Sequence, residues 1–138
     1  MKIHWLRVVL GALLLEGILF VVLVPISFIN KTLFLIAVPV GVLVFGYLVT
    51  RWLLKKVSAR LVLHGALIGI VATLIYFGLV FGQPGGLAAA IAVYGAPLFY
   101  FCQAMRIAGC VAGAIHVQRQ RQSAVLDAAK AQGASGVT

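Results

Sequence analysis

The sequence predicts an all-α membrane protein in which four transmembrane helices form an antiparallel bundle with both termini on the cytoplasmic side. Three observations predict this: the composition, four long apolar stretches, and an uneven distribution of cations. Of the 138 residues, 64% are hydrophobic and 9% are charged, and the mean hydropathy is +1.17. An average soluble domain is about 45–50% apolar and about 25% charged. Because a small domain buries only part of its surface, we expect lipid to be the solvent of this chain.

Four apolar stretches have the length of a membrane span, since a bilayer core of about 30 Å requires about 20 apolar residues in a helix. Their connections are short and contain polar or helix-breaking residues, which makes neighbouring helices antiparallel. We therefore expect a transmembrane domain over 1–117 and a polar cytoplasmic tail over 118–138. The predicted spans are about 5–28, 33–54, 61–82 and 87–117.

The last stretch is longer than a bilayer requires, and Pro97 divides it. Proline removes one backbone hydrogen bond and tends to kink a helix. We expect one bent helix, with 87–96 as an outer segment and 97–117 as the main span. Good helix formers continue to Gln132, so the helix is expected to project beyond the membrane, and 133–138 should fray.

The cations predict the orientation, because Lys and Arg concentrate in cytoplasmic loops. One side of the predicted bundle carries only Lys31, and Arg106 lies inside a span. The remaining nine of the eleven basic residues fall at the N-terminus, in the middle loop and in the tail: Lys2, Arg7, Arg51, Lys55, Lys56, Arg60, Arg119, Arg121 and Lys130. We therefore place both termini in the cytoplasm, in a multi-pass protein of the cell (cytoplasmic) membrane.

The formal charge of +9 is explained by the same distribution. The cations flank apolar runs, where they are expected to bind the anionic lipids of the inner leaflet. The chain has no basic, aromatic-interleaved soluble segment, so nucleic acid is not an expected partner. A membrane protein partner or a second copy of the chain is the expected protein partner.

Glu16 and Arg106 are the two charges predicted to lie inside the membrane. A single charge at the bilayer centre costs roughly 2.5–3.5 kcal/mol on insertion scales. Glu16 lies eleven residues from Trp5, and Arg106 lies eleven residues before Val117, so both are roughly 16 Å deep at 1.5 Å per residue. We predict an intramembrane salt bridge between the first and the fourth span.

Two interpretations of this pair stay open. In the structural one, the salt bridge specifies how the helices pair, as buried ion pairs do in some proteins. In the functional one, Glu16 exchanges a proton or a cation as Arg106 moves away, because charges inside a membrane are candidates for function.

The helix around Arg106 has a polar face directed to the bundle. Residues three, four and seven apart share a face, and this face contains Phe99, Cys102, Gln103, Arg106, Gly109, Cys110 and Gly113. Small residues four apart allow close helix packing, and three such pairs occur: Gly65 and Gly69, Gly78 and Gly82, and Gly109 and Gly113. Together they predict a tight bundle that needs no roomy pore.

Cysteine, histidine and acidic residues indicate neither a cofactor nor a catalytic site. Cys102 and Cys110 are eight residues apart, roughly 12 Å along a helix, which is too far for a disulfide bond. His4, His64 and His116 match no metal-ligand spacing. Glu16 and Asp127 are the two acids of the chain, and no nucleophile elbow or P-loop is present. We therefore expect a protein that is not an enzyme and has no metal or other cofactor.

The stretch Gly11-Ala12-Leu13-Leu14-Leu15-Glu16-Gly17 resembles the first helix of the small multidrug resistance transporters. The resemblance implies four helices and a membrane-embedded glutamate at Glu16. Two features depart from that family: the third span has Tyr76 but no tryptophan, and the fourth contains Arg106.

The leading functional hypothesis is a small multi-spanning integral membrane protein that serves as a non-enzymatic accessory or assembly component. The alternative is a proton-coupled small-molecule transporter that uses Glu16. Such a transporter is expected to be an oligomer, because one four-helix bundle leaves little room for a pathway.

Overall fold

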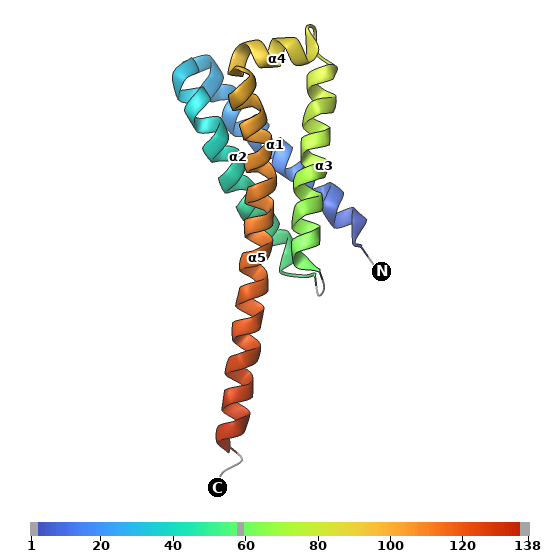
Figure 1. The fold of residues 1–138 in the computed structure, drawn as a ribbon, viewed down its shortest axis with the longest axis vertical. Helices are drawn as coiled ribbons and strands as arrows, with labels where there is room; N and C mark the ends of the chain where they lie inside the picture. Colours follow the sequence, from blue (N-terminus) through green and yellow to red (C-terminus); the bar gives the residue numbers. More distant parts are fainter. Residues whose placement is uncertain (1–2, 58–59, 136–138) are drawn as a thin grey trace.

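The computed structural model describes residues 3–57 and 60–135, and over these residues it contains five α-helices and no strand. Four helices are long and apolar enough to cross a membrane: α1, α2, α3 and the part of α5 up to Lys130. The prediction of an all-helical chain with four long apolar helices is confirmed. The helices are α1 (Trp5–Ile29), α2 (Lys31–Leu54), α3 (Leu61–Phe81), α4 (Gly86–Tyr94) and α5 (Ala96–Ser135), as Figure 1 shows.

The prediction of one bent helix over 87–117 is wrong, because this stretch forms two separate helices. The break lies at Gly95, whose φ of 76° and ψ of 144° are outside the helical region, and not at Pro97. Pro97 is the second residue of α5, where the missing N–H would have had no partner in the helix. As a result, α4 lies across one end of the bundle and connects α3 to α5 (Figure 1).

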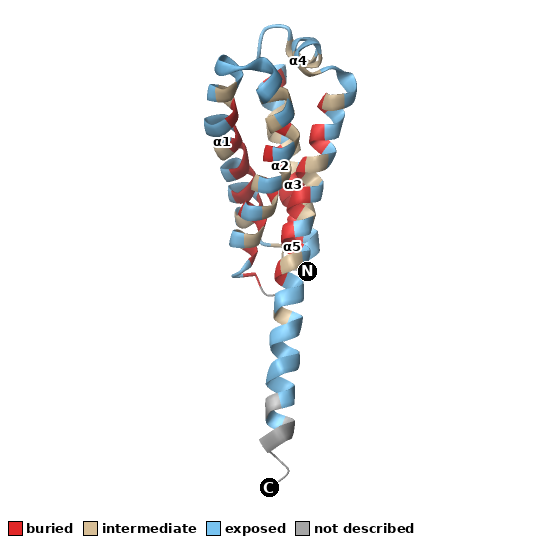
Figure 2. Cartoon of the chain, turned by 90° about the vertical axis from the view of Figure 1, so that its left-hand side faces the viewer, coloured by how far each residue is buried: buried red, intermediate tan, exposed pale blue. Residues whose placement is uncertain are grey.

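The four long helices are arranged in a ring. α1 packs against α2 and α3, α5 packs against the same two helices, and α1 and α5 therefore occupy opposite corners. The buried residues of α1 recur every three or four positions, as expected for a helix with one packed face. Figure 2 shows this buried stripe facing the neighbouring helices, whereas the outward faces are exposed. Large apolar side chains such as Val21, Phe28 and Ile29 cover these outward faces.

We call the two ends of the ring the α4 end, which carries residues 82–95, and the loop end, which carries residues 55–60. Glycines bring α5 close to both neighbours in the half next to the loop end. A Cβ atom on Gly65 would lie 2.7 Å from the Cys110 carbonyl oxygen, and one on Gly69 would lie 2.8 Å from the Ile107 Cα. These contacts leave no room for larger residues.

The other face of α5 packs against α2 in the same way. Cβ atoms on Gly109 and Gly113 would collide with the carbonyl oxygens of Leu43 and Tyr47. The expectation for the Gly78 and Gly82 pair is wrong, because no described atom of another helix lies within 4 Å of a Cβ atom on Gly78. Close helix packing is therefore a property of the half next to the loop end.

Two arginines hold the chain at the loop end. Arg7 of α1 donates a hydrogen bond of 2.7 Å from Nη1 to the Lys56 carbonyl. Arg121 of α5 donates to three carbonyl oxygens where α2 ends, at 3.2, 2.8 and 2.5 Å: those of Leu54, Lys55 and Val57. A cation beside the C-terminal carbonyls of a helix is favourable, so Arg121 ties the extension of α5 to α2.

Candidate functional site

Glu16 and Arg106 meet in the centre of the ring. Arg106 Nε lies 3.2 Å from Glu16 Oε1. Because α1 and α5 occupy opposite corners, this ion pair crosses the middle of the bundle. The exposed fractions are 9% for Glu16 and 3% for Arg106, so both charges are removed from solvent.

The two partners are held unequally. Arg106 Nη1 donates a hydrogen bond of 2.6 Å to Gln103 Oε1, and its Cζ lies 4.6 Å from the centroid of the Tyr76 ring, within cation–π range. Neither Glu16 Oε1 nor Arg106 Nε has a hydrogen-bond partner among the described residues, because the contact between them is an ion pair without hydrogen-bond geometry. A carboxylate can accept about four hydrogen bonds. Glu16 is therefore the member with unused acceptor capacity.

A cavity of about 430 Å³ extends from this pair towards the α4 end. Its lining comes from all five helices, and Glu16, Val42, Tyr76 and Arg106 form the part farthest from α4. Small-molecule sites typically have volumes of about 300–1,000 Å³. The expectation of a tight bundle without a roomy interior is therefore wrong in this half.

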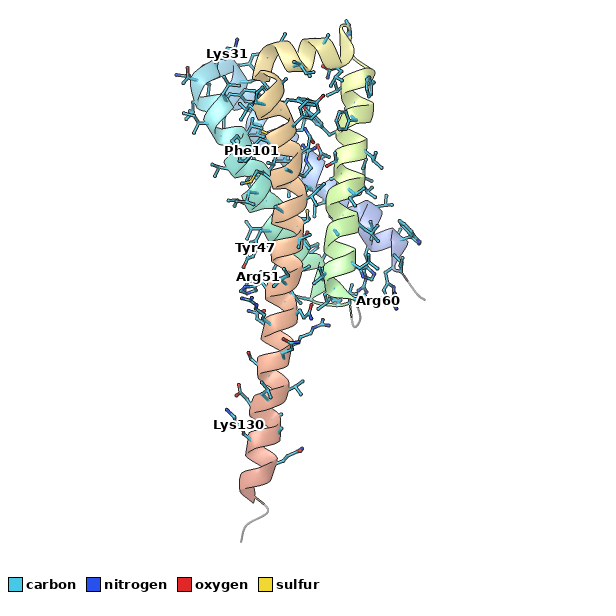
Figure 3. The ribbon with its side chains drawn as sticks, viewed as in Figure 1. Lys31, Tyr47, Arg51, Arg60, Phe101 and Lys130 are labelled. Carbon is cyan, nitrogen blue, oxygen red and sulfur yellow. The ribbon has the colours of Figure 1, made fainter. Side chains whose placement is uncertain are left out.

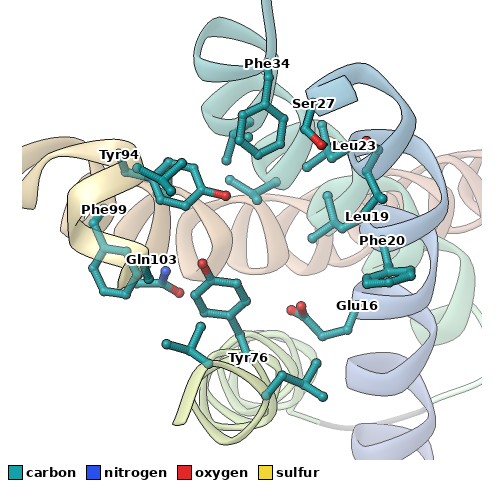
Figure 4. Close-up of a pocket in the computed structure, with 18 of the residues that line it drawn as sticks. Glu16, Leu19, Phe20, Leu23, Ser27, Phe34, Tyr76, Tyr94, Phe99 and Gln103 are labelled. Carbon is teal, nitrogen blue, oxygen red and sulfur yellow. Dashed lines mark hydrogen bonds between the residues drawn. The ribbon is translucent and has the colours of Figure 1, made fainter. Parts of the chain in front are cut away.

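The side chains in the cavity combine polar and aromatic groups. Figure 4 shows the Glu16 carboxylate and the hydroxyl groups of Tyr76 and Tyr94 pointing into the same space. The walls are mostly branched aliphatic and aromatic, with Phe20, Phe34 and Phe99 as the phenylalanines. This arrangement can bind a molecule with one polar end and an apolar body.

The other residues singled out in the sequence fall into two groups. Cys102 and Gln103 line the cavity. The four glycines of the predicted packing positions lie outside it, between the ion pair and the loop end: Gly65, Gly69, Gly109 and Gly113. The face that contains Arg106 is buried at every position from Phe99 to Gly113 that was assigned to it.

Sequence reasoning missed Tyr94 and Phe34 as cavity residues. Tyr94 reaches the cavity only because the chain breaks at Gly95 and lays α4 across the bundle. No local pattern around Tyr94 signals this position, since it depends on the arrangement of three helices. Phe34 lies in an apolar run whose residues look alike in sequence, and its ring packs on Tyr94 with 5.6 Å between the centroids.

His64, His116 and the two cysteines contact other parts of the protein. The buried His64 lies between two backbone groups: its Nε2 accepts a hydrogen bond of 3.2 Å from the His4 N–H, and its Nδ1 lies 2.9 Å from the Arg60 carbonyl oxygen. The His116 ring packs edge-on against Tyr47. Cys102 and Cys110 are both buried and free. In the described part of the chain, no three His, Cys, Asp or Glu side chains are grouped so as to hold a metal ion.

Comparison with known proteins adds no assignment to this site. No protein-family model, no curated protein and no solved structure matches the chain. Its function must therefore be argued from the ion pair and the cavity themselves.

Proposed function

We propose that this chain is a multi-pass protein of the cytoplasmic membrane with α1, α2, α3 and α5 as an antiparallel set of spans and both termini in the cytoplasm. The distribution of charge supports this orientation. Lys31 lies at the α4 end, whereas Arg51 and Arg60 lie at the opposite end and Lys130 lies on the extension of α5 (Figure 3). With the cation-rich end inside, α4 lies at the outer surface of the membrane.

Reporter fusions test this orientation. A phosphatase that is active only outside the cytoplasm should be active when fused after Gln83 and inactive when fused after Lys130. Fusion of a fluorescent protein that matures in the cytoplasm should give the opposite result at the two positions. Phosphatase activity after Lys130 would contradict the orientation.

We propose further that the protein is a non-enzymatic accessory component of that membrane and that it binds a small molecule at the Glu16–Arg106 pair. The observation that carries this proposal is the position of the buried pair at the inner end of the 430 Å³ cavity. A salt bridge that only specified helix pairing would need no cavity beside it. It would also gain from a full set of hydrogen bonds, which Glu16 does not have.

The extension of α5 is the surface on which such an accessory protein would meet a partner. Val125 and Leu126 are exposed on this part of α5. A membrane protein partner or a second copy of the chain would cover them.

Native mass spectrometry of the full chain, purified in mild detergent from the membranes in which it is made, tests the binding function. The wild type should carry a small molecule, and Glu16→Gln, which keeps the shape of the side chain but removes its charge, should lose it. A Gly17→Ala variant is the matched control, because a Cβ atom there meets no described atom within 4 Å. Equal occupancy in the wild type and Glu16→Gln would contradict a binding role for the pair.

A second candidate is a proton-coupled small-molecule transporter that uses Glu16. One observation favours it: the cavity reaches Ser27 and Gln83 near the α4 end, whereas glycine contacts close the half towards the loop end. One-sided access to a site near the bilayer midplane is a feature of transporters. If Glu16→Gln folds normally and abolishes proton-driven uptake into vesicles of the molecule found by mass spectrometry, transport is supported. Unchanged uptake would leave the accessory role.

A further inference from the structure

The ionised groups in the cavity balance each other. Among the residues that line it, Glu16 and Arg106 are the two with charged side chains. Lys31, the nearest cation in the chain to the α4 end, is not part of the lining. The cavity therefore has a formal charge of zero while it holds one full negative and one full positive charge side by side.

We propose that the ligand of this cavity is an uncharged or zwitterionic amphipathic molecule whose polar head, with both hydrogen-bond donors and acceptors, contacts the Glu16–Arg106 pair. This inference rests on the binding role proposed above and specifies the chemical class of its ligand. The apolar body of the molecule lies along the aromatic and aliphatic walls and points towards α4.

Because the two charges in the cavity balance each other, neither a cation nor an anion is expected as its ligand. A cation bound to Glu16 would displace Arg106, which would then be a buried charge without its carboxylate. An anion bound to Arg106 would leave Glu16 in the same position. Isolated charges in a low-dielectric interior are costly, whereas an uncharged or zwitterionic head leaves the pair intact.

The free hydrogen-bonding capacity defines the head. The Glu16 carboxylate points into the cavity (Figure 4), so the head must donate a hydrogen bond to it, whereas its Oε1 atom is buried against Arg106 Nε. The side chains of Tyr76 and Tyr94 share one hydrogen bond, which leaves one of their two O–H groups free. This O–H group and the guanidinium group of Arg106 are donors that an acceptor on the same head can use. A head with donors alone would leave the donors of the cavity unpaired, and a head with acceptors alone would leave the Glu16 carboxylate unpaired.

The depth of the pair sets the direction in which the ligand binds. The polar groups lie at the inner end of the cavity, near the middle of the spans, and the wall between them and α4 is mostly apolar. A membrane lipid has the reverse orientation, because its head stays at the interface and its chains lie deep. An acyl chain would place methylene groups against Glu16, so a lipid tail does not fit this site.

The two native cysteines provide an experiment on the unmodified chain. Cys102 lines the cavity, and Cys110 lies on the same face of α5 about two turns further along, in the glycine-packed half. In lipid nanodiscs, N-ethylmaleimide should alkylate Cys102 faster than Cys110, as measured residue by residue by mass spectrometry. Three probes with one body then compare the heads: 4-butylbenzamide is uncharged, 4-butylbenzylamine is cationic and 4-butylbenzoate is anionic at pH 7.

The expected result is that the amide protects Cys102 at a concentration about tenfold lower than either charged probe, which corresponds to 1.4 kcal/mol. None of the probes should change the alkylation of Cys110. In Glu16→Gln, the cavity has a net positive charge, because Arg106 is then its one charged side chain. In this variant, 4-butylbenzoate should protect Cys102 at a lower concentration than the other two probes.

The possible failures separate the two proposals. If Cys102 and Cys110 react at the same rate and no probe protects either, the cavity does not bind ligands and the binding function itself is overturned. If Cys102 is reactive but a charged probe protects it as well as the amide does, the binding function stands and the ligand class is overturned. The comparison in the native chain decides this alone, even if Glu16→Gln does not fold.

Discussion

At the scale of single residues, Arg106 and Glu16 differ in how they tolerate the loss of a partner. A carboxyl group that loses its counter-ion can bind a proton and become neutral. A guanidinium group cannot be deprotonated in a protein, so an unpaired arginine keeps its charge. Since both side chains are buried in the centre of the ring, this difference should appear in stability.

We therefore expect Glu16→Leu to destabilise the protein by about 3–5 kcal/mol, the usual cost of leaving one charge of a buried ion pair without its partner. Arg106→Leu should cost less, because Glu16 can take up a proton. The double variant should be close to the wild type. Thermal unfolding in detergent, followed by circular dichroism, measures the three variants, and a Glu16→Leu variant as stable as the wild type would contradict this prediction.

Part of this site could be predicted from the sequence at the residue scale. Counting residues from each end of the apolar runs places Glu16 and Arg106 at one depth, because a helix rises by a constant amount per residue. The cavity could not be predicted in this way. Its volume depends on how far apart α1, α3 and α5 lie beside the pair, and that distance is set by packing between segments remote in the sequence.

At the scale of helices, the glycines separate a tightly packed half from an open one. Gly65 in α3 is the clearest case, because a Cβ atom there would lie 2.6 Å from the Ala114 Cβ and 2.7 Å from a backbone oxygen. Gly78 in the same helix has no such neighbour. The same substitution should therefore have opposite effects at the two positions.

Gly65→Ala is expected to destabilise the protein by about 1–3 kcal/mol, because α3 and α5 must move apart to accommodate the methyl group. Gly78→Ala, the matched control, should be neutral or stabilise by up to about 1 kcal/mol, since alanine is the better helix former. Unfolding midpoints of both variants in one detergent provide the measurement. Equal effects at both positions would show that α3 does not approach α5 as described.

Gly95 controls the direction of α4. Its backbone angles, with φ of 76° and ψ of 144°, are in a region that residues with a Cβ atom rarely adopt. Gly95→Ala should cost about 1–3 kcal/mol and should change the position of α4 over the cavity. An increased rate of Cys102 alkylation with an unchanged rate at Cys110 is the expected result, and unchanged rates at both cysteines would contradict it.

The bounds of some helices could be predicted from the sequence, and those of others could not. The apolar runs predict α1, α2 and α3 almost to the residue, since the period and the length of a span are visible in the sequence. The run that contains α4 is mostly apolar on both sides of the break. Only the φ angle at Gly95 distinguishes two helices from one, and glycine permits such an angle without requiring it.

At the scale of the whole molecule, Arg121 joins the extension of α5 to the ring. It lies outside the apolar part of α5 and donates to the carbonyl groups at the end of α2. Its role could not be predicted from the sequence, where it is one of two arginines in a polar tail.

Arg121→Ala should therefore destabilise the protein by about 1.5–3 kcal/mol, the range for a hydrogen bond from a charged group. Arg119→Ala is the control, because Arg119 is exposed two residues earlier on the same helix. Chemical unfolding monitored by tryptophan fluorescence compares the two variants. If both lose the same amount of stability, the contacts of Arg121 with α2 do not contribute.

The continuity of α5 has a mechanical consequence. Arg106 of α5 lies in the centre of the ring of helices. From there, α5 continues without a break to Ser135, which is 29 residues and roughly 44 Å further along the axis. A straight helix of this length acts as a lever whose short arm ends in the cavity. A tilt of α5 by a few degrees, caused by a molecule that enters beside Arg106, would move the tip of the extension by several ångströms, far enough for a bound partner to sense it.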